Sequence, residues 1–231
     1  MTRIIDRQEI HGFYDQNSRR VFSDLEFRYC RFWSSRISIT YNPKRRSIVR
    51  NVRLIHCEQG GCAVETAIVE DVTVDGLRTH GYLQTWGAVY KHVVLKGNID
   101  SIMISPVIAT GTATPKQQRV FDEANARYYE TVDWALDISE GRFIDCEIQR
   151  VPAKLVIRDP DTQVVITREK ALMGEWKKLD LSKTYWRTSI EFFLERGDQD
   201  LVLVAPKRYS KYQDLLDGLK MLRDVGVAEP D

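Results

Sequence analysis

The strongest constraint on the fold of this chain is a five-residue repeat of apolar side chains near the N-terminus. Phe22, Phe27 and Phe32 lie five residues apart, and Leu25 and Cys30 keep the same spacing, each two residues before a Phe. An α-helix repeats every 3.6 residues and a strand every two, so neither element alone gives this pattern over several cycles. The spacing therefore predicts a chain built from five-residue sides.

The pairing returns after residue 50 and adds a longer period. Val52, Val72 and Val93 begin similar segments, at spacings of 20 and 21 residues. A period of 20 to 50 residues is typical of a solenoid, in which each turn buries its apolar face against its neighbours. Four five-residue sides make one turn of about 20 residues, and successive turns stack at the strand spacing of about 4.8 Å. The pattern weakens between residues 82 and 89.

The strings FSDLE-FRYCR-FWSSR and CAVET-AIVED-VTVDG resemble the repeats of pentapeptide-repeat proteins. The resemblance covers about residues 22–104 with interruptions, and a fragment at 139–155. It implies a four-sided right-handed β-helix with a small or apolar residue two positions before a central Leu or Phe. The repeat is degenerate here, because the small residue is often Val or Leu. A less regular right-handed β-helix is the alternative.

The predicted fold class is therefore mainly β, a right-handed parallel β-helix or solenoid with a helical insertion and an α/β C-terminal cap. We assign residues 1–21 to an N-terminal cap and 22–170 to the solenoid, with the helical insertion near 114–130. Residues 171–231 form an α/β cap or an interaction appendage. Solenoids need such caps because an end turn has no neighbour to cover it.

Local signals refine this division. Thr114 and Gln117 form a capping box, with Pro115 at the first helical position, and Ser210 and Gln213 form a second capping box. Gly226 is a suitable end for the second helix. Lys44-Arg-Arg46, after an Asn-Pro turn signal, is predicted to lie in a solvated loop. Further strands are expected at 142–149, 153–158, 163–167 and 201–204, and a helix is expected around Trp186, Ile190 and Phe193.

Charge and cysteine content limit the possible partners and location. The chain has 34 basic and 33 acidic residues, for a net charge of +1. This balance argues against nucleic acid or an anionic membrane as the partner. The sequence MTRIIDRQEI lacks the apolar region of a signal peptide, and no apolar run reaches the 18 residues of a membrane helix. Four cysteines in a chain of this length do not make a disulfide framework, so we expect a cytoplasmic protein.

The sequence predicts no catalytic, cofactor-binding or metal-binding residues. Cys57 and Cys62 are five residues apart, which equals the period of the repeat. We therefore interpret the cysteines as buried packing residues. His56 and His92 are expected at neighbouring corners of different turns. Asp71–Gly76 has the start of a calcium loop but lacks its final Glu. Three aromatic residues at steps of four are candidates for contact with a partner: Tyr82, Trp86 and Tyr90.

The first functional hypothesis is a non-catalytic scaffold that binds another protein, with a bacterial inhibitor or toxin-neutralising protein as a subtype by analogy. The alternative is a carbohydrate-active β-helix enzyme that uses an Asp/Glu pair in a groove. Homodimerisation through the solenoid ends or the C-terminal helix is compatible with both hypotheses.

Overall fold

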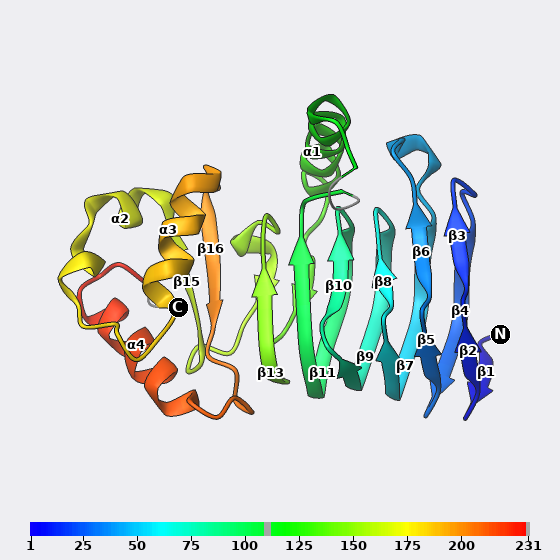
Figure 1. Cartoon of the computed structure of the whole chain (residues 1–231), viewed down its shortest axis with the longest axis horizontal. Helices are drawn as coiled ribbons and strands as arrows, with labels where there is room; N and C mark the ends of the chain where they lie inside the picture. Colours follow the sequence, from blue (N-terminus) through cyan, green and yellow to red (C-terminus); the bar gives the residue numbers. More distant parts are fainter. Residues whose placement is uncertain (109–111, 230–231) are drawn as a thin grey trace.

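A large parallel β-sheet, strongly curled into a half-barrel, makes up most of the molecule (Figure 1). The structure is a computed structural model, and it describes residues 1–108 and 112–229. The parallel strands are β1 (Arg3–Asp6), β2 (Glu9–His11), β3 (Tyr14–Gln16), β4 (Val21–Arg28), β5 (Arg31–Trp33), β6 (Arg36–Ile39), β7 (Ile48–Gly60), β8 (Ala63–Val64), β9 (Ile68–His80), β10 (Leu83–Trp86), β11 (Val89–Ser105), β12 (Leu136–Asp137), β13 (Gly141–Ile148) and β14 (Val156–Ile157).

Successive segments of about 20 residues stack as rungs of this sheet. We number the rungs as residues 3–16, 21–39, 48–64, 68–86, 89–105 and 136–148. Leu25, Val52, Val72 and Val93 are register partners from one rung to the next, so the apolar positions of the repeat form continuous rows. These rows face the inside of the curl, where they form one hydrophobic core. The arrangement is compatible with a solenoid-like fold.

The five-residue spacing appears in the backbone as corners with positive φ. In the third rung these corners are Asn51, His56 and Gly61, with φ of 54°, 50° and 63°. A positive φ is uncommon outside Gly, and Asn, Asp and His tolerate it better than most residues. The corners of neighbouring rungs follow the same five-residue spacing: Asp24, Tyr29 and Ser34, then Asp71, Gly76 and Gly81. The repeat thus marks where the chain bends as well as which side chains point inward.

Residues 3–16, within the segment predicted as an N-terminal cap, have the same structure as the rungs that follow. Strands β1, β2 and β3 pair in parallel with β4, β5 and β6, and Ile5 is the register partner of Phe27. Among the described residues, no strand pairs with the other edge of this first rung. The N-terminal end of the sheet is therefore an open edge (Figure 1).

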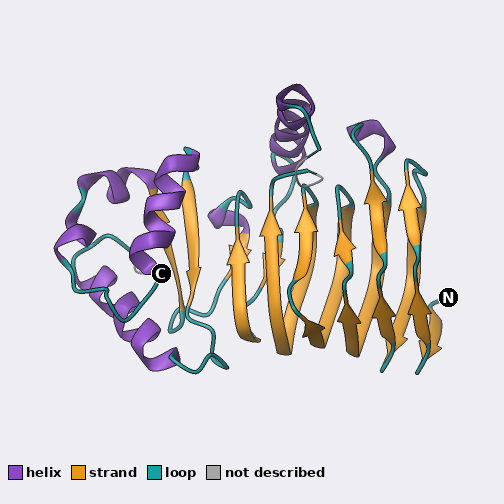
Figure 2. Ribbon diagram, in the orientation of Figure 1, coloured by secondary structure: helices purple, strands orange, loops and turns teal. Residues whose placement is uncertain are grey.

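The C-terminal end carries helices and two antiparallel strands (Figure 2). Strand β16 (Asp200–Val204) pairs in antiparallel fashion with β13 and with β15 (Gln163–Thr167). Helices α2 (Arg168–Met173), α3 (Trp186–Arg196) and α4 (Tyr212–Asp224) pack against the face of these strands that is turned away from the curled sheet. Short 3₁₀ turns lie at Ala153–Leu155 and Glu175–Lys178, and another lies between β6 and β7 at Pro43–Arg45. We call residues 163–229 the C-terminal cap.

Strands β15 and β16 separate two hydrophobic cores. Val165, Val202 and Val204 belong to the core inside the curled sheet. Their neighbours along the strands, such as Val164 and Leu203, belong to a second core with the cap helices. Side chains alternate between the two faces of a strand. Because β15 and β16 are apolar on both faces, each strand contributes side chains to both cores.

The predicted helical insertion is α1 (Pro115–Tyr129), and it projects from the middle of the sheet (Figure 1). The Thr114 hydroxyl accepts a hydrogen bond from the Gln117 backbone N–H, and the Gln117 side chain accepts one from the Thr114 N–H. The capping box predicted there is confirmed. Part of the linker before it, residues 109–111, lies outside the described residues.

Three local predictions were wrong. Ser210 does not cap α4, which begins at Tyr212 with Lys211 as N-cap and no side-chain capping bond, because residues 206–212 form turns of their own. The segment 153–158 contains only the two-residue strand β14, after a 3₁₀ turn. Arg46 is 7% exposed and does not lie in a solvated loop. Its guanidinium lies 4.7 Å from the Phe121 ring centroid and donates a hydrogen bond to Asn125.

Candidate binding groove between the sheet and the C-terminal cap

A groove of about 290 Å³ lies where the outer surface of β13 meets α3 and β16. Asp145 and Glu147 of β13 line it, followed by Gln149 directly after the strand, because alternate residues of an extended chain share a face. Strand β16 contributes Leu201–Val204. The groove thus combines a polar strand face with apolar side chains at the junction of two structural parts, a common location for binding sites.

One face of α3 forms the opposite wall. Tyr185 at its N-terminus and then Ser189, Phe192 and Arg196 follow one another at helical spacing and line the groove. The other face, with Trp186, Ile190 and Phe193, is buried in the cap core and fixes the helix in place. Phe192 is 54% exposed although it is large and apolar. A rigid helix therefore presents an exposed aromatic side chain beside the carboxylates of β13.

Tyr82 reaches this region from the fourth rung. Its hydroxyl donates a hydrogen bond to the Asp145 carboxylate, 63 residues along the chain. Burial raises the pKa of Tyr82, and the neighbouring Asp145 carboxylate adds to the increase. The tyrosine is therefore a neutral donor at physiological pH, and it holds Asp145 in one orientation at the edge of the groove.

Tyr185 links the groove to the cap. Its ring packs edge-to-face against Trp186, with centroids 4.6 Å apart, and against Tyr209 at 6.4 Å. Burial raises the pKa of Tyr185, and Asp145 contributes to the same shift. Nearby, Arg208 forms an ion pair of 2.8 Å with Asp100 of the fifth rung. The cap and the sheet are thus joined by polar contacts beside the groove.

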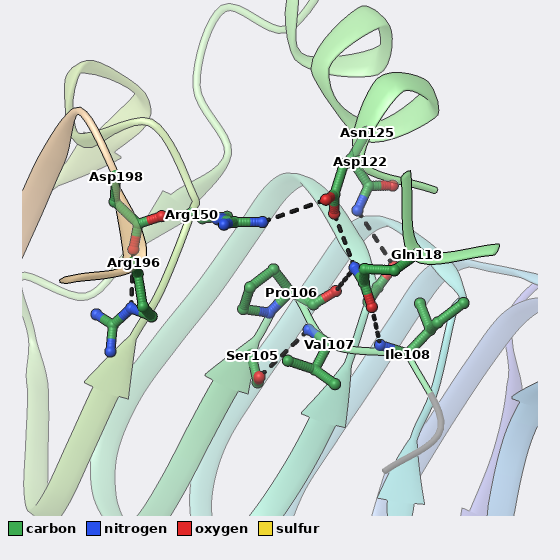
Figure 3. Close-up of polar contacts among 11 residues, drawn as sticks. Ser105, Pro106, Val107, Ile108, Gln118, Asp122, Asn125, Arg150, Arg196 and Asp198 are labelled. Carbon is green, nitrogen blue, oxygen red and sulfur yellow. Dashed lines mark hydrogen bonds and ion pairs between the residues drawn. The ribbon is translucent and has the colours of Figure 1, made fainter. Parts of the chain in front are cut away.

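A second set of contacts fixes the other side of the cap (Figure 3). Arg150, two residues after the end of β13, donates from Nε to Asp198 Oδ1 at 2.6 Å, and its Nη1 lies 3.3 Å from Asp122 of α1. Arg196 donates to the second oxygen of Asp198 at 2.9 Å. The Asp198 side chain is almost fully buried. Because Arg196 is held by this network, its position at the end of the groove is set by the fold.

The three predicted contact residues do not form one surface. Tyr82 is 38% exposed and lies at the groove, whereas Tyr90 is 4% exposed in the core. The Tyr90 hydroxyl donates to Thr85 Oγ1 at 2.6 Å. Trp86 is half-buried at the end of β10 and does not line the groove. Although the three residues are four apart in the sequence, the side chains of this segment point in turn to the inside and the outside of the curled sheet. The three rings therefore do not lie together.

The cysteines and histidines have structural surroundings. Cys30 and Cys57 are buried, and their thiols donate to backbone carbonyls of the previous rung. Burial raises the pKa of Cys57 to about 11. His56 stacks on Tyr29, while His92 at a different corner bonds to Asp71 and Asp133. Within the described residues, no three His, Cys, Asp or Glu side chains are grouped to hold a metal ion.

Sequence reasoning missed most of the groove. Asp145, Tyr185 and Arg196 carry no local motif, and about 50 residues of sequence separate the strand from the end of the helix.

No helix in the described part of the chain has the length and apolar character needed to cross a membrane. No protein-family model, curated protein or solved structure matches this chain.

Proposed function

We propose that this protein is a non-catalytic scaffold that binds a segment of another protein in the groove between β13 and α3. The observation that carries the proposal is the combination of carboxylates and an exposed aromatic on rigid elements: Asp145 and Glu147 opposite Phe192. Exposed aromatic residues next to a concavity are typical of the residues that dominate protein interfaces. A bacterial inhibitor or toxin-neutralising role is one form of this function.

The charges of the groove favour a basic partner side chain. Asp145 and Glu147 are both acidic, and Arg196, the one basic side chain among the described residues that line the groove, is paired with Asp198. An Arg or Lys of the partner would form charge-assisted hydrogen bonds with the carboxylates, each worth about 1.5–3 kcal/mol. Its alkyl part would pack on Phe192, whose ring also attracts a cation.

The proposal includes the finer fold of the scaffold, a right-handed solenoid of pentapeptide-like turns. Two observations support it. The positive-φ corners recur every five residues, and the apolar rows keep register across rungs of about 20 residues. Such a stack is stiff, because each rung is hydrogen-bonded to its neighbours along its length. A stiff support keeps β13 in place under the groove.

Selection from a random peptide library displayed on phage tests the binding function. We expect enrichment of peptides with Arg or Lys next to an apolar residue. Glu147→Gln and Phe192→Ala should each weaken the selected peptides about tenfold or more, because they remove the charge and the aromatic contact. Glu191→Gln is the matched control, since Glu191 is exposed on α3 outside the groove lining. Peptides that bind all three variants equally would contradict the proposal.

The alternative function is a carbohydrate-active enzyme, and one observation favours it. Asp145 and Glu147 lie two residues apart on the same strand and both face the groove. Two carboxylates about 5–10 Å apart are what glycoside cleavage requires. Release of reducing ends from a polysaccharide panel, lost in Glu147→Gln, would establish this activity. No release from any polysaccharide would remove the alternative.

Homodimerisation remains a further prediction. The open edge of the first rung could pair with another copy, but its short strands carry the charged residues Arg3, Asp6 and Glu9. Short, charged edge strands disfavour pairing between sheets. Light scattering over a range of concentrations measures the outcome, and a monomer at every concentration would exclude the dimer.

A further inference from the structure

Four exposed basic side chains lie on two adjacent loops near the N-terminal end of the sheet. Arg19 and Arg20 belong to the loop between the first and second rungs, and Lys44 and Arg45 to the loop between the second and third. The loops are bonded to each other, because the Ser47 hydroxyl accepts a hydrogen bond from the Arg20 backbone N–H at 3.2 Å. We call Arg19, Arg20, Lys44 and Arg45 the basic patch.

The basic patch is not neutralised by its own chain. Within the described residues, none of its four side chains forms an ion pair. By contrast, Arg31 on a strand of the same rungs pairs with Glu9 at 2.8 Å. The nearby Asp15 carboxylate is buried and accepts hydrogen bonds from Ser18 and the Ser38 backbone N–H. Residues 17–20 and 40–47 hold five basic and no acidic residues, so positive charge is concentrated here although the whole chain has a net charge of +1.

The groove between β13 and α3 has the complementary character. Asp145 and Glu147 supply negative charge beside the exposed ring of Phe192. The basic patch is flanked by exposed apolar side chains, Val21 at 53% and Tyr41 at 38% exposure. Surfaces of opposite charge attract each other and select their relative orientation. The two loops therefore present what the groove favours, which is basic side chains next to apolar ones.

The loops of one chain cannot fill the groove of the same chain. The basic patch lies beside the first three rungs, whereas the groove lies at the sixth rung and the cap, toward the opposite end of the long axis (Figure 1). Three rung spacings alone amount to roughly 14 Å at about 4.8 Å each. A contact between these two surfaces would therefore join different copies. Such a heterologous contact adds copies head to tail, into rings or open chains.

We propose that the basic patch of one copy docks in the groove of a second copy. The inference rests on the proposed function, because it names a second copy of this chain as a partner for the same groove. Basic side chains of the patch would form charge-assisted hydrogen bonds with Asp145 and Glu147. Because these charges are exposed and are screened by salt, the association is weak and depends on concentration. A docked copy would compete with a segment of another protein, so self-association would regulate access to the groove.

Sedimentation velocity of the full chain over a range of concentrations tests the proposal. We expect the mean mass in low salt to rise with concentration beyond the mass of a dimer. It should fall toward the mass of the monomer in about 1 M salt, where the Debye length is only about 3 Å. A chain that stays monomeric at every concentration in low salt would overturn the proposal. If that monomeric chain still selects basic peptides that Glu147→Gln weakens, the proposed function stands without self-association.

Charge reversal on each surface identifies the contact. The double variant Arg20→Glu/Arg45→Glu and the single variant Glu147→Lys should each weaken self-association about tenfold or more, because like charges then face each other. Mixing the two variants should restore association, since the natural patch of one fits the natural groove of the other. Lys183→Glu is the matched control, because Lys183 is exposed on the cap outside the groove lining, and it should associate as the natural chain does. Association that survives both reversals, or that does not return on mixing, would overturn the contact between patch and groove.

Discussion

The two ends of this molecule are stabilised by different kinds of contact. At the N-terminal end, stacked rungs place apolar side chains in rows, and the inner residues stay partly exposed around an apolar cavity inside the curled sheet. At the C-terminal end, the cap buries large aromatic side chains completely, including Trp176, Trp186 and Phe193. The structure of the first region depends on repeated backbone hydrogen bonds between rungs and on repeated corners. The structure of the second depends on close packing of side chains that differ in size and shape.

This difference teaches where function can arise in such a chain. A repeated rung gives every position the same surroundings, so it does not create a distinct site on its outer surface. The groove arises where the repeat ends, because α3 and β16 there meet the last rung at an angle that the repeat does not supply. An apolar cavity inside the curled sheet extends from the first rung to the fifth, and no described strand covers the outer edge of the first rung.

Trp186→Ala should have the largest effect on stability. Trp186 is 1% exposed in the cap core, and its Nε1 donates to the Leu215 carbonyl at 2.9 Å. Removal of such a side chain costs about 3–5 kcal/mol. Urea denaturation followed by near-UV and far-UV circular dichroism should show the cap melting before the sheet. Phe192→Ala, on the exposed face of α3, is the control, with a change within about 0.5 kcal/mol. A single shifted transition at both wavelengths would contradict two separable regions.

Matched Leu→Ala substitutions compare the deep and open parts of the sheet. Leu77 is 3% exposed in the fourth rung, whereas Leu25 in the second rung is partly exposed near the open edge of the sheet. We expect Leu77→Ala to cost about 2–5 kcal/mol, the range for a fully buried Leu. Leu25→Ala should cost less, because the site is already partly solvated. Chemical denaturation measures both free energies of unfolding, and equal costs would mean that the N-terminal rungs are as tightly packed as the centre.

The corners allow a finer comparison of the same two parts. Gly76 and Gly12 both have positive φ, of 73° and 60°. A Cβ at residue 76 would lie 2.7 Å from His56 Nδ1, whereas a Cβ at residue 12 would meet nothing within 4 Å. Gly12→Ala should therefore cost only the backbone penalty of about 1–2 kcal/mol. Gly76→Ala should cost more, since His56 must also move. Thermal unfolding distinguishes the two, and a larger loss for Gly12→Ala would contradict this account.

The smallest expected effect is a pH dependence at the His92 corner. Burial lowers the pKa of His92, but its hydrogen bonds with Asp133 at 2.7 Å and Asp71 at 3.0 Å outweigh burial and hold the pKa above 6.5. Stability from this contact is therefore fully present below pH 6.5 and is lost as the pH rises through the folded-state pKa. An NMR titration of His92 measures the shift. Asp133→Asn should move the pKa back down, and an unchanged value would refute the assignment.

The sequence predicted the parts of the fold that depend on local geometry. The five-residue spacing of Phe22, Phe27 and Phe32 predicted stacked five-residue sides, and the structure has corners at Asp24, Tyr29 and Ser34 with the same spacing. The capping box at Thr114 and the helix at Trp186–Arg196 were also predicted correctly. Each of these follows from residues that are close together in the chain, so their chemistry is visible in one line of sequence.

The tertiary structure alone determined the contacts between residues that are distant in the sequence. The sequence could not show that Tyr82 bonds to Asp145, or that Arg46 is buried against Phe121 and not solvated. It predicted that inward rows form a core, but not that an apolar cavity of about 410 Å³ remains inside the curled sheet, or that Gln59 Nε2 is buried without a hydrogen-bond partner among the described residues. Apolar spacing specifies which side chains point inward. How closely they fill the enclosed space depends on the curvature of the whole sheet, to which every rung contributes.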